Sequence, residues 1–332
     1  MSTDSQIISE IDLDANGKHT GYLRLPHSVH RSAYGWLPVP IGSVRNGEGP
    51  VALLMSGNHG DEYEGQIVLP ELLRQLEPND ISGQLIVLPM ANFPAADAGL
   101  RTSPIDQGNL NRTFPGRANG TPTEMLAHYI EHELLQRSDY LLDVHSGGSS
   151  LMYDPSMLMQ NAPDATTQSF YIELMESIGF TNGLFYPPVD SGTYSSSAAH
   201  RKNAVPITIE AAGGGTVTVP TLHQLRQGIP NYLRKIGILG GEVKTFSSPT
   251  RVMNVIEADY CYADQDGLFE PAVDLLDEVE AGQVAGFIHT PKRPMEKPQP
   301  VVFLKNGVVV CKRVPAMVRH GDCLFHLAEE IA

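Results

Sequence analysis

The sequence predicts an α/β fold, with a mixed, mostly parallel sheet covered by helices and a small all-β part after it. Short apolar runs of strand length alternate with helical patterns as far as residue 246. From residue 247 onward, only short β-like runs separated by turns remain. We therefore expect a larger domain over residues 1–246 and a small β domain over residues 247–332.

The first half of the larger domain begins with weak strand signals and continues with strong ones. Alternating runs such as Gly21 to Leu25 indicate edge strands in the first fifty residues. The continuous apolar run Val51 to Ser56 is typical of a buried strand. A helix is expected from Glu64 to Leu76, where apolar residues recur with helical spacing, and a second buried strand from Gln84 to Met90.

The second half begins with a long polar loop over residues 92–120, and loops of that length in compact domains are often functional. The same periodicities then predict the remaining elements, which are a helix at Thr123 to Gln136, a strand at Tyr140 to Val144, a helix around Ser169 to Ile178, a strand at Val205 to Ile209 and a helix at Thr221 to Ile236.

The C-terminal β domain contains five predicted strand segments, which are Val252 to Ile256, Val284 to Ile288, Val301 to Leu304, Val308 to Cys311 and Leu324 to Leu327. The segment looks like a biotinyl/lipoyl-type barrel sandwich. The hairpin from Thr290 to Pro298 lacks a lysine flanked by methionines, so a swinging-arm carrier is disfavoured. We expect a structural or gating role for this domain.

The composition restricts the class of partner. The 332 residues include 38 acidic and 23 basic ones, a formal net charge of −15, which disfavours nucleic acid and anionic membranes. No apolar stretch approaches the roughly 20 residues of a membrane span. The N-terminus is polar and acidic, which argues against a signal peptide and predicts a cytoplasmic protein. Three scattered cysteines without CxxC spacing argue against a disulfide framework and a cysteine zinc site.

Three reactive residues follow predicted strands directly: His59, His145 and Glu210. Ligands of such sheets bind beyond the carboxyl ends of the strands, so these residues should converge. His59 and Glu62 stand three residues apart at a strand-to-helix turn, and His145 would complete a His₂Glu set. That set leaves a coordination position open, as catalytic zinc requires. Asp143 has the strand phase to orient a ligand.

Other motifs give weaker signals. The inverted zinc-protease pattern HxxEH is matched by His128, Glu131 and His132. The apolar residues expected to face the core lie on another side of that helix, so the side with the two histidines is expected to be solvated. The sequence contains neither a GxSxG nucleophile elbow nor a Walker loop. The glycine run Gly213 to Gly215 is expected to shape the turn beside Glu210.

The segments HGDE at His59, DVHSGG at Asp143 and TIEAAGGG at Thr208, in this order, resemble the succinylglutamate desuccinylase and aspartoacylase family of zinc carboxypeptidase-like proteins. The resemblance runs from about Val51 to Ile236, and the C-terminal β segment also looks like the appended domain of that family. It implies a zinc hydrolase catalytic domain that cleaves linear amides, with one zinc ion held by the three predicted ligands.

The resemblance also implies roles for further residues. Glu210 matches the carboxylate that serves as general base and acid. In the loop from Asp106 to Phe114, Asn111 and Arg112 match residues that hold the substrate carboxylate. Arg101 matches the arginine that polarises the scissile carbonyl, although this sequence has extra residues between the two arginines.

Overall resemblance is greatest to the N-acetyl-diaminobutyrate deacetylases of ectoine degradation, which implies N(alpha)-acetyl-L-2,4-diaminobutyrate as the small-molecule substrate. Tyr194 and Arg201 are expected to line the pocket, and Asp190 or Glu176 to hold the substrate ammonium group. Because Arg201 could bind a second carboxylate, a desuccinylase or aspartoacylase acting on a dicarboxylate is the alternative. A non-catalytic zinc-containing binding protein is the alternative from another class. The sequence leaves the oligomeric state open, a homo-oligomer included.

Overall fold

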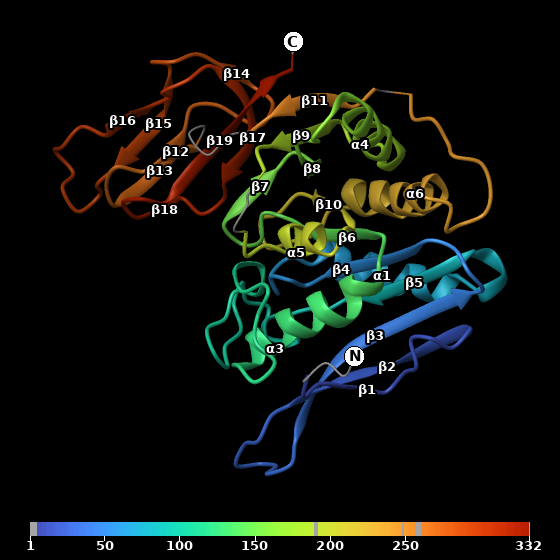
Figure 1. Cartoon of the computed structure of the whole chain (residues 1–332). Helices are drawn as coiled ribbons and strands as arrows, with labels where there is room; N and C mark the ends of the chain where they lie inside the picture. The colour runs from blue at the N-terminus through green and yellow to red at the C-terminus, as the bar shows by residue number, and fades with distance from the viewer. Residues whose placement is uncertain (1–4, 189–191, 248, 256–259, 332) are drawn as a thin grey trace.

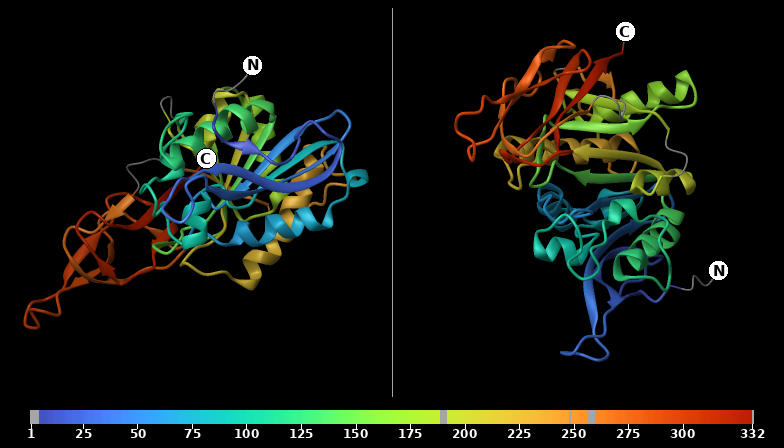
Figure 2. Two further views of the ribbon diagram at one scale, coloured as in Figure 1. Left: turned by 90° about the horizontal axis from the view of Figure 1, so that it is seen from below. Right: turned by 90° about the vertical axis from the view of Figure 1, so that its left-hand side faces the viewer.

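The computed structural model describes residues 5–188, 192–247, 249–255 and 260–331. Figures 1 and 2 show a large twisted sheet with helices on both faces, a long N-terminal hairpin at one margin and the C-terminal β part at the other. The ribbon thus has the α/β architecture that the sequence predicts.

The centre of the sheet consists of four parallel strands in the spatial order β5 (Gly83–Leu88), β4 (Val51–Ser56), β6 (Tyr140–His145) and β10 (Val205–Glu210). Each was predicted as an apolar run, because strands covered on both faces need apolar side chains on both. In β4, Ala52 and Leu54 pack into one core, whereas Leu53 and Met55 pack into the other.

Antiparallel strands border this centre on both sides. The strands on the β5 side are β1 (Ile8–Ser9), β2 (Gly17–Pro26) and β3 (Trp36–Asn46). On the other side, β8 (Ser156–Gln160) runs antiparallel to β10, and β9 (Asn182–Tyr186) runs parallel to β8. The predicted mixed sheet is therefore confirmed, but its four central parallel strands are bordered on both sides by antiparallel neighbours, β3 and β8. Strands β8 and β9 were not predicted.

Helices cover both faces of this sheet (Figure 2). The first face carries α1 (Glu64–Gln75), α4 (Ala165–Ile178) and α6 (Val219–Lys235). The second face carries α3 (Pro122–Tyr129), its π-helical and 3₁₀ continuations η3 (Ile130–Leu134) and η4 (Leu135–Arg137), and α5 (Ser195–Arg201). None of the described helices combines the length and the apolar character needed to cross a bilayer.

The helix boundaries follow capping chemistry. The Thr121 side chain caps α3 in a capping box with Glu124, Asp164 caps α4, and Thr218 caps α6. A short helix α2 (Phe93–Ala98) stands in the segment predicted as loop, with Gly99 at its end in the left-handed conformation at φ 62°. Six residues are too few to give a helical periodicity. Two 3₁₀ turns, η1 (Pro78–Asp80) and η2 (Leu110–Arg112), complete the helical elements.

The C-terminal part joins the large sheet through β11 (Arg251–Asn254), which runs parallel to β9 and antiparallel to β19 (Cys323–Glu330). A second junction is made by β7 (Leu151–Tyr153), which pairs with β17 (Gly307–Arg313). The other strands are β12 (Tyr260–Tyr262), β13 (Gly267–Pro271), β14 (Glu278–Val279), β15 (Val284–His289), β16 (Gln299–Val302) and β18 (Met317–Val318).

Among these C-terminal strands, β16, β15, β13 and β18 form a four-stranded antiparallel sheet, and the others extend the end of the large sheet. A separate apolar core in this part of the chain includes Phe269, Phe303 and Phe325. Four predicted segments coincide with or overlap observed strands. The fifth, Val252 to Ile256, does so as far as Asn254, and Ile256 lies outside the described residues. Closure into a barrel and the domain boundary at residues 246 and 247 stay predictions.

Helices α4 and α6 pack so closely that their contact can be tested at Gly228. A Cβ atom at Gly228 would lie 2.3 Å from the backbone oxygen of Ile178. Alanine in place of a helical glycine ordinarily gains about 1 kcal/mol. Here we expect Gly228→Ala to lower the free energy of unfolding by up to about 2 kcal/mol in urea denaturation, because overpacking costs about 1–3 kcal/mol and offsets that gain.

The exposed neighbour Gln227 supplies the control, since Gln227→Ala should change stability by less than about 0.5 kcal/mol. A Gly228→Ala variant more stable than the parent protein would show that the two helices do not meet this closely.

Candidate metal centre and active site

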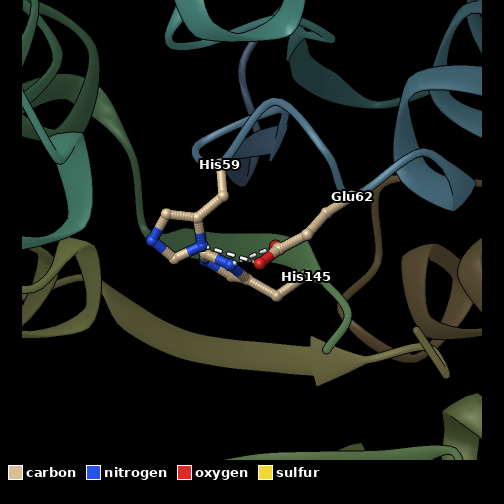
Figure 3. A group of neighbouring side chains, drawn as sticks. All are labelled: His59, Glu62 and His145. Carbon is tan, nitrogen blue, oxygen red and sulfur yellow. Dashed lines mark hydrogen bonds and ion pairs between the residues drawn. The ribbon is translucent and has the colours of Figure 1, made fainter. Parts of the chain in front are cut away.

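The three predicted metal ligands converge at the carboxyl end of the central strands (Figure 3). His59 lies in the turn after β4, Glu62 lies two residues before α1, and His145 is the last residue of β6. One ligand atom from each residue lies within 4.8 Å of the others, and all three side chains are buried. Within the described part of the chain, this is the one group of three or more such residues that could hold a metal ion.

The ring orientations direct both Nδ1 atoms at the Glu62 carboxylate. Nδ1 of His59 lies 2.7 Å from Oε1, and Nδ1 of His145 lies 2.8 Å from Oε2 (Figure 3). The Nε2 atom of His59 lies 3.1 Å from Oδ1 of Asn109, and that of His145 lies 2.9 Å from Oδ2 of Asp143. In the state that binds a metal ion, we assign the ring hydrogens to Nε2, because these oxygens can only accept. Both Nδ1 lone pairs then remain for a shared ligand.

The ligand atoms of these three residues, and the negative charge around them, fit a divalent cation. Two imidazoles and one carboxylate form the His₂Glu set of catalytic zinc sites. Burial lowers the pKa of His59 and favours the neutral ring that a metal needs. Burial acts in the same direction on His145, but the negative charges of Asp143 and Glu62 overcome it and raise the pKa of His145 well above its usual value. Such a negative field stabilises a metal ion placed among these groups.

The loops that carry the ligands are fastened to one another. Oδ2 of the buried Asp61 accepts hydrogen bonds of 2.8 Å from both the backbone nitrogen and the hydroxyl of Ser149. Gly148 has φ 55°, and a Cβ atom there would lie 2.8 Å from Oδ2 of Asp61. The backbone nitrogen of Gly215 donates to the oxygen of Gly148 at 2.7 Å. The glycine run after Glu210 therefore does shape the turn beside the site.

Glu210 is the last residue of β10 and lies directly opposite His145 in the sheet register. Its Oε2 atom is buried and has no hydrogen-bond partner. Burial raises the pKa of Glu210 to about 8; the positive charge of His145 opposes the shift and the negative charge of Glu62 adds to it. A carboxyl group with these properties can take up and release a proton near neutral pH.

Arg101 lies beside the metal ligands. Its Nη1 atom is 3.4 Å from Nδ1 of His59 and 3.5 Å from Oε1 of Glu62, and 44% of its side chain is exposed. The structure thus places this predicted residue where a guanidinium can reach a molecule bound at the cluster.

Asn111, Arg112 and Tyr194 also lie together. Oδ1 of Asn111 accepts a hydrogen bond of 2.8 Å from the backbone nitrogen of Ser195. The Arg112 guanidinium lies 4.5 Å from the centroid of the Tyr194 ring, a cation–π distance. The amide nitrogen of Asn111 and the exposed guanidinium of Arg112 are available donors for a carboxylate.

Arg201 is engaged elsewhere. It forms two hydrogen bonds of 2.9 and 2.7 Å with the carboxylate of Glu131, and its Nη1 atom donates to the backbone oxygen of Gly192. Because Glu131 is only 2% exposed, the expectation that the HxxEH face is solvated is wrong at this residue. Arg201 compensates the buried charge, and its guanidinium is not free for a second substrate carboxylate.

The rival HxxEH motif does not assemble a metal site. The rings of His128 and His132 lie 4.4 Å apart, but Nδ1 of His132 accepts from the Lys202 ammonium group at 3.2 Å.

Of the two carboxylates expected to hold the substrate ammonium group, Asp190 lies outside the described residues. Glu176 lines a separate cavity of about 380 Å³ with Lys235 and Phe246, so its expected place in the site is wrong.

Several site residues were not found from the sequence. Asn109 stands in the loop singled out for Asn111 and Arg112, and Asn58 precedes His59 directly. Their positions beside recognised motifs were the only available signal. Ser195 and Ser149 carry none, because a serine in a predicted loop or helix start is too common to be distinctive.

Comparison with known proteins agrees with this site. Residues 48–236 match the succinylglutamate desuccinylase/aspartoacylase catalytic domain. The chain is 37% identical over 328 residues to the N-alpha-acetyl-L-2,4-diaminobutyric acid deacetylase of Halomonas elongata, which covers 98% of this chain and 96% of that protein.

Two solved structures have the same fold over nearly the whole chain. A succinylglutamate desuccinylase/aspartoacylase from Rhodobacter sphaeroides superposes with a TM-score of 0.93 at 33% identity, covering 99% of this chain and 100% of the other. The product-bound ectoine utilization protein EutE (DoeB) from Ruegeria pomeroyi gives a TM-score of 0.93 at 34% identity, covering 98% and 99%.

The metal centre predicts a simple pattern of metal content. The parent protein should bind about one zinc ion per chain, and His59→Ala, Glu62→Ala and His145→Ala should each lose it, since three protein ligands are the minimum of such a site. Metal content after dialysis, measured by mass spectrometry of the element, checks this. The double variant His128→Ala, His132→Ala is the control and should keep its zinc. Zinc lost from the control but kept in the His59 variant would place the metal at the HxxEH motif.

Proposed function

The chain belongs to the succinylglutamate desuccinylase/aspartoacylase family, and on that premise we propose that it is a zinc-dependent deacetylase of N(alpha)-acetyl-L-2,4-diaminobutyrate. The products would be acetate and L-2,4-diaminobutyrate. One observation carries the proposal: the buried group of His59, Glu62 and His145 stands beside Glu210 and Arg101, in a chain whose similarity to a named deacetylase extends over 98% of its length.

Zinc would be held by the Nδ1 atoms of His59 and His145 and by the Glu62 carboxylate. When bound, it supplies a Lewis acid that polarises an amide carbonyl and activates water near neutral pH. Asn109 and Asp143 fix the two rings, as groups outside the ligand set commonly do.

Glu210 is the residue that would transfer the proton. Its carboxyl group can accept the proton of the attacking water and return it to the amide nitrogen as the C–N bond breaks. The unpartnered Oε2 atom supports this role, because a group already tied into hydrogen bonds would have to release them first. Arg101, beside the ligands, is suited to stabilise the negative charge that develops on the carbonyl oxygen.

Asn111 and Arg112 would bind the carboxylate of the amino-acid part of the substrate. An arginine can bind a carboxylate with two parallel hydrogen bonds, and Tyr194 holds the Arg112 guanidinium in place by stacking. Because Glu131 neutralises Arg201, the pocket offers no free charge from that residue for a second carboxylate. This favours a substrate with a single carboxylate over an acyl-aspartate or a succinylglutamate. The cytoplasmic location, the oligomeric state and a gating role of the β domain stay predictions.

A substrate panel tests the proposal. Release of a free amine would be measured with N(alpha)-acetyl-diaminobutyrate, N(gamma)-acetyl-diaminobutyrate, N-acetylaspartate and N-succinylglutamate. We expect the first to be cleaved preferentially, with the activity lost on chelation and restored by zinc. Preference for a dicarboxylate would overturn the substrate, and absence of turnover on all four despite bound zinc would support the binding-protein alternative.

Glu210→Gln tests the proton-transfer role. Loss of a general acid–base group ordinarily lowers the rate about 10²–10⁴-fold, so kcat should fall by about that factor. KM and zinc content should remain near the parent values, because Glu210 is not among the proposed ligands. Glu176→Gln makes the same chemical change outside the site and should leave kcat unaltered. An active Glu210→Gln protein would require another residue to move the proton.

A further inference from the structure

We propose that Ser195 is a positioning residue that connects the loop around Asn111 with the metal ligand His145. Asp143 lies between them, and the inference rests on the proposed function only for the role of the Asn111 loop in binding a substrate carboxylate.

The first contact of Ser195 is with the carboxylate behind His145. The Ser195 hydroxyl donates to Oδ2 of Asp143 at 2.6 Å, and the two residues are 1% and 0% exposed. The same Oδ2 atom accepts from Nδ2 of Asn58 at 3.0 Å and lies 2.9 Å from Nε2 of His145. Since Oδ1 of Asp143 has no partner, these three contacts at one oxygen orient the whole carboxylate.

The second contact of Ser195 is with the proposed substrate loop. Its backbone nitrogen donates to Oδ1 of Asn111 at 2.8 Å. The two residues before it are attached to the same loop, since the Tyr194 ring stacks on Arg112 and the Thr193 oxygen accepts from the nitrogen of Phe114 at 3.3 Å. Three consecutive residues are thus bound to a segment of four.

These contacts form one chain of neighbours from Asn111 through Ser195 and Asp143 to His145. Hydrogen bonds from a hydroxyl to a buried carboxylate are strong, because the acceptor is charged. Removing the Ser195 hydroxyl leaves Asp143 with Asn58 and His145 as partners and weakens the restraint on the orientation of its carboxylate. The imidazole of His145, which donates to the same oxygen, would then be held less firmly in its direction toward the metal.

The chain offers a matched control. Ser196 is the next residue of α5, is also buried at 6% exposure, and its hydroxyl contacts Tyr186 at 3.2 Å instead of Asp143. Ser195→Ala and Ser196→Ala therefore remove the same atom from the same buried helical turn. Ser195→Thr keeps the hydroxyl and tests whether that group restores the parent behaviour.

The experiment measures zinc affinity of the full-length variants by competition with a chromophoric chelator, without substrate. Loss of a partner behind a metal ligand ordinarily weakens metal binding 10–100-fold. We expect about a tenfold weakening for Ser195→Ala, and changes below about twofold for Ser196→Ala and Ser195→Thr. The visible spectrum of the cobalt-substituted Ser195→Ala protein should also change, because the geometry around the metal is altered.

Equal zinc affinity in Ser195→Ala and the parent protein would overturn the inference. Equal weakening in Ser195→Ala and Ser196→Ala would overturn it as well, since that result indicates general damage to α5. Because these measurements need no substrate, they separate the two proposals: a specific zinc defect in a protein that cleaves none of the four amides would keep the positioning role and reject the proposed function.

Discussion

The site depends on one interaction, a carboxylate buried between two imidazoles. Burial alone would raise the pKa of Glu62, but the adjacent rings of His59 and His145 overcome this effect and lower it, so that the carboxylate stays charged. An unpaired buried charge would be strongly unfavourable. The surrounding structure therefore has to hold both rings within hydrogen-bond distance of Glu62, and the contacts of Asn109 and Asp143 with the two rings serve that requirement.

The parallel centre of the sheet meets this requirement by bringing three strand ends to one edge. His59 follows β4, while His145 and Glu210 end β6 and β10 as paired residues in the register. The rings are then fixed from behind by Asn109 and Asp143, which come from different parts of the chain. One ring is held by a neutral amide and the other by a carboxylate, so the two ligands differ in electrostatic environment although they share the same donor atom.

Local signals explain what could be predicted from the sequence. Buried parallel strands such as β4 and β6 are continuous apolar runs, and the HxxE spacing of His59 and Glu62 is visible within four residues. Contacts between distant segments leave no such pattern. The pairing of Arg201 with Glu131 and the contact of Ser195 with Asp143 join residues 70 and 52 positions apart, and no periodicity indicates either. Strands β8 and β9 were missed because they are short and contain polar residues.

The most direct test of the metal centre is X-ray absorption at the zinc edge of the protein loaded with one equivalent of zinc. The geometry predicts a first shell of nitrogen and oxygen only, at about 2.0–2.2 Å, with the outer-shell scattering of two imidazole rings. A sulfur shell at about 2.3 Å would contradict this account, because it would place the metal on cysteine and away from His59, Glu62 and His145.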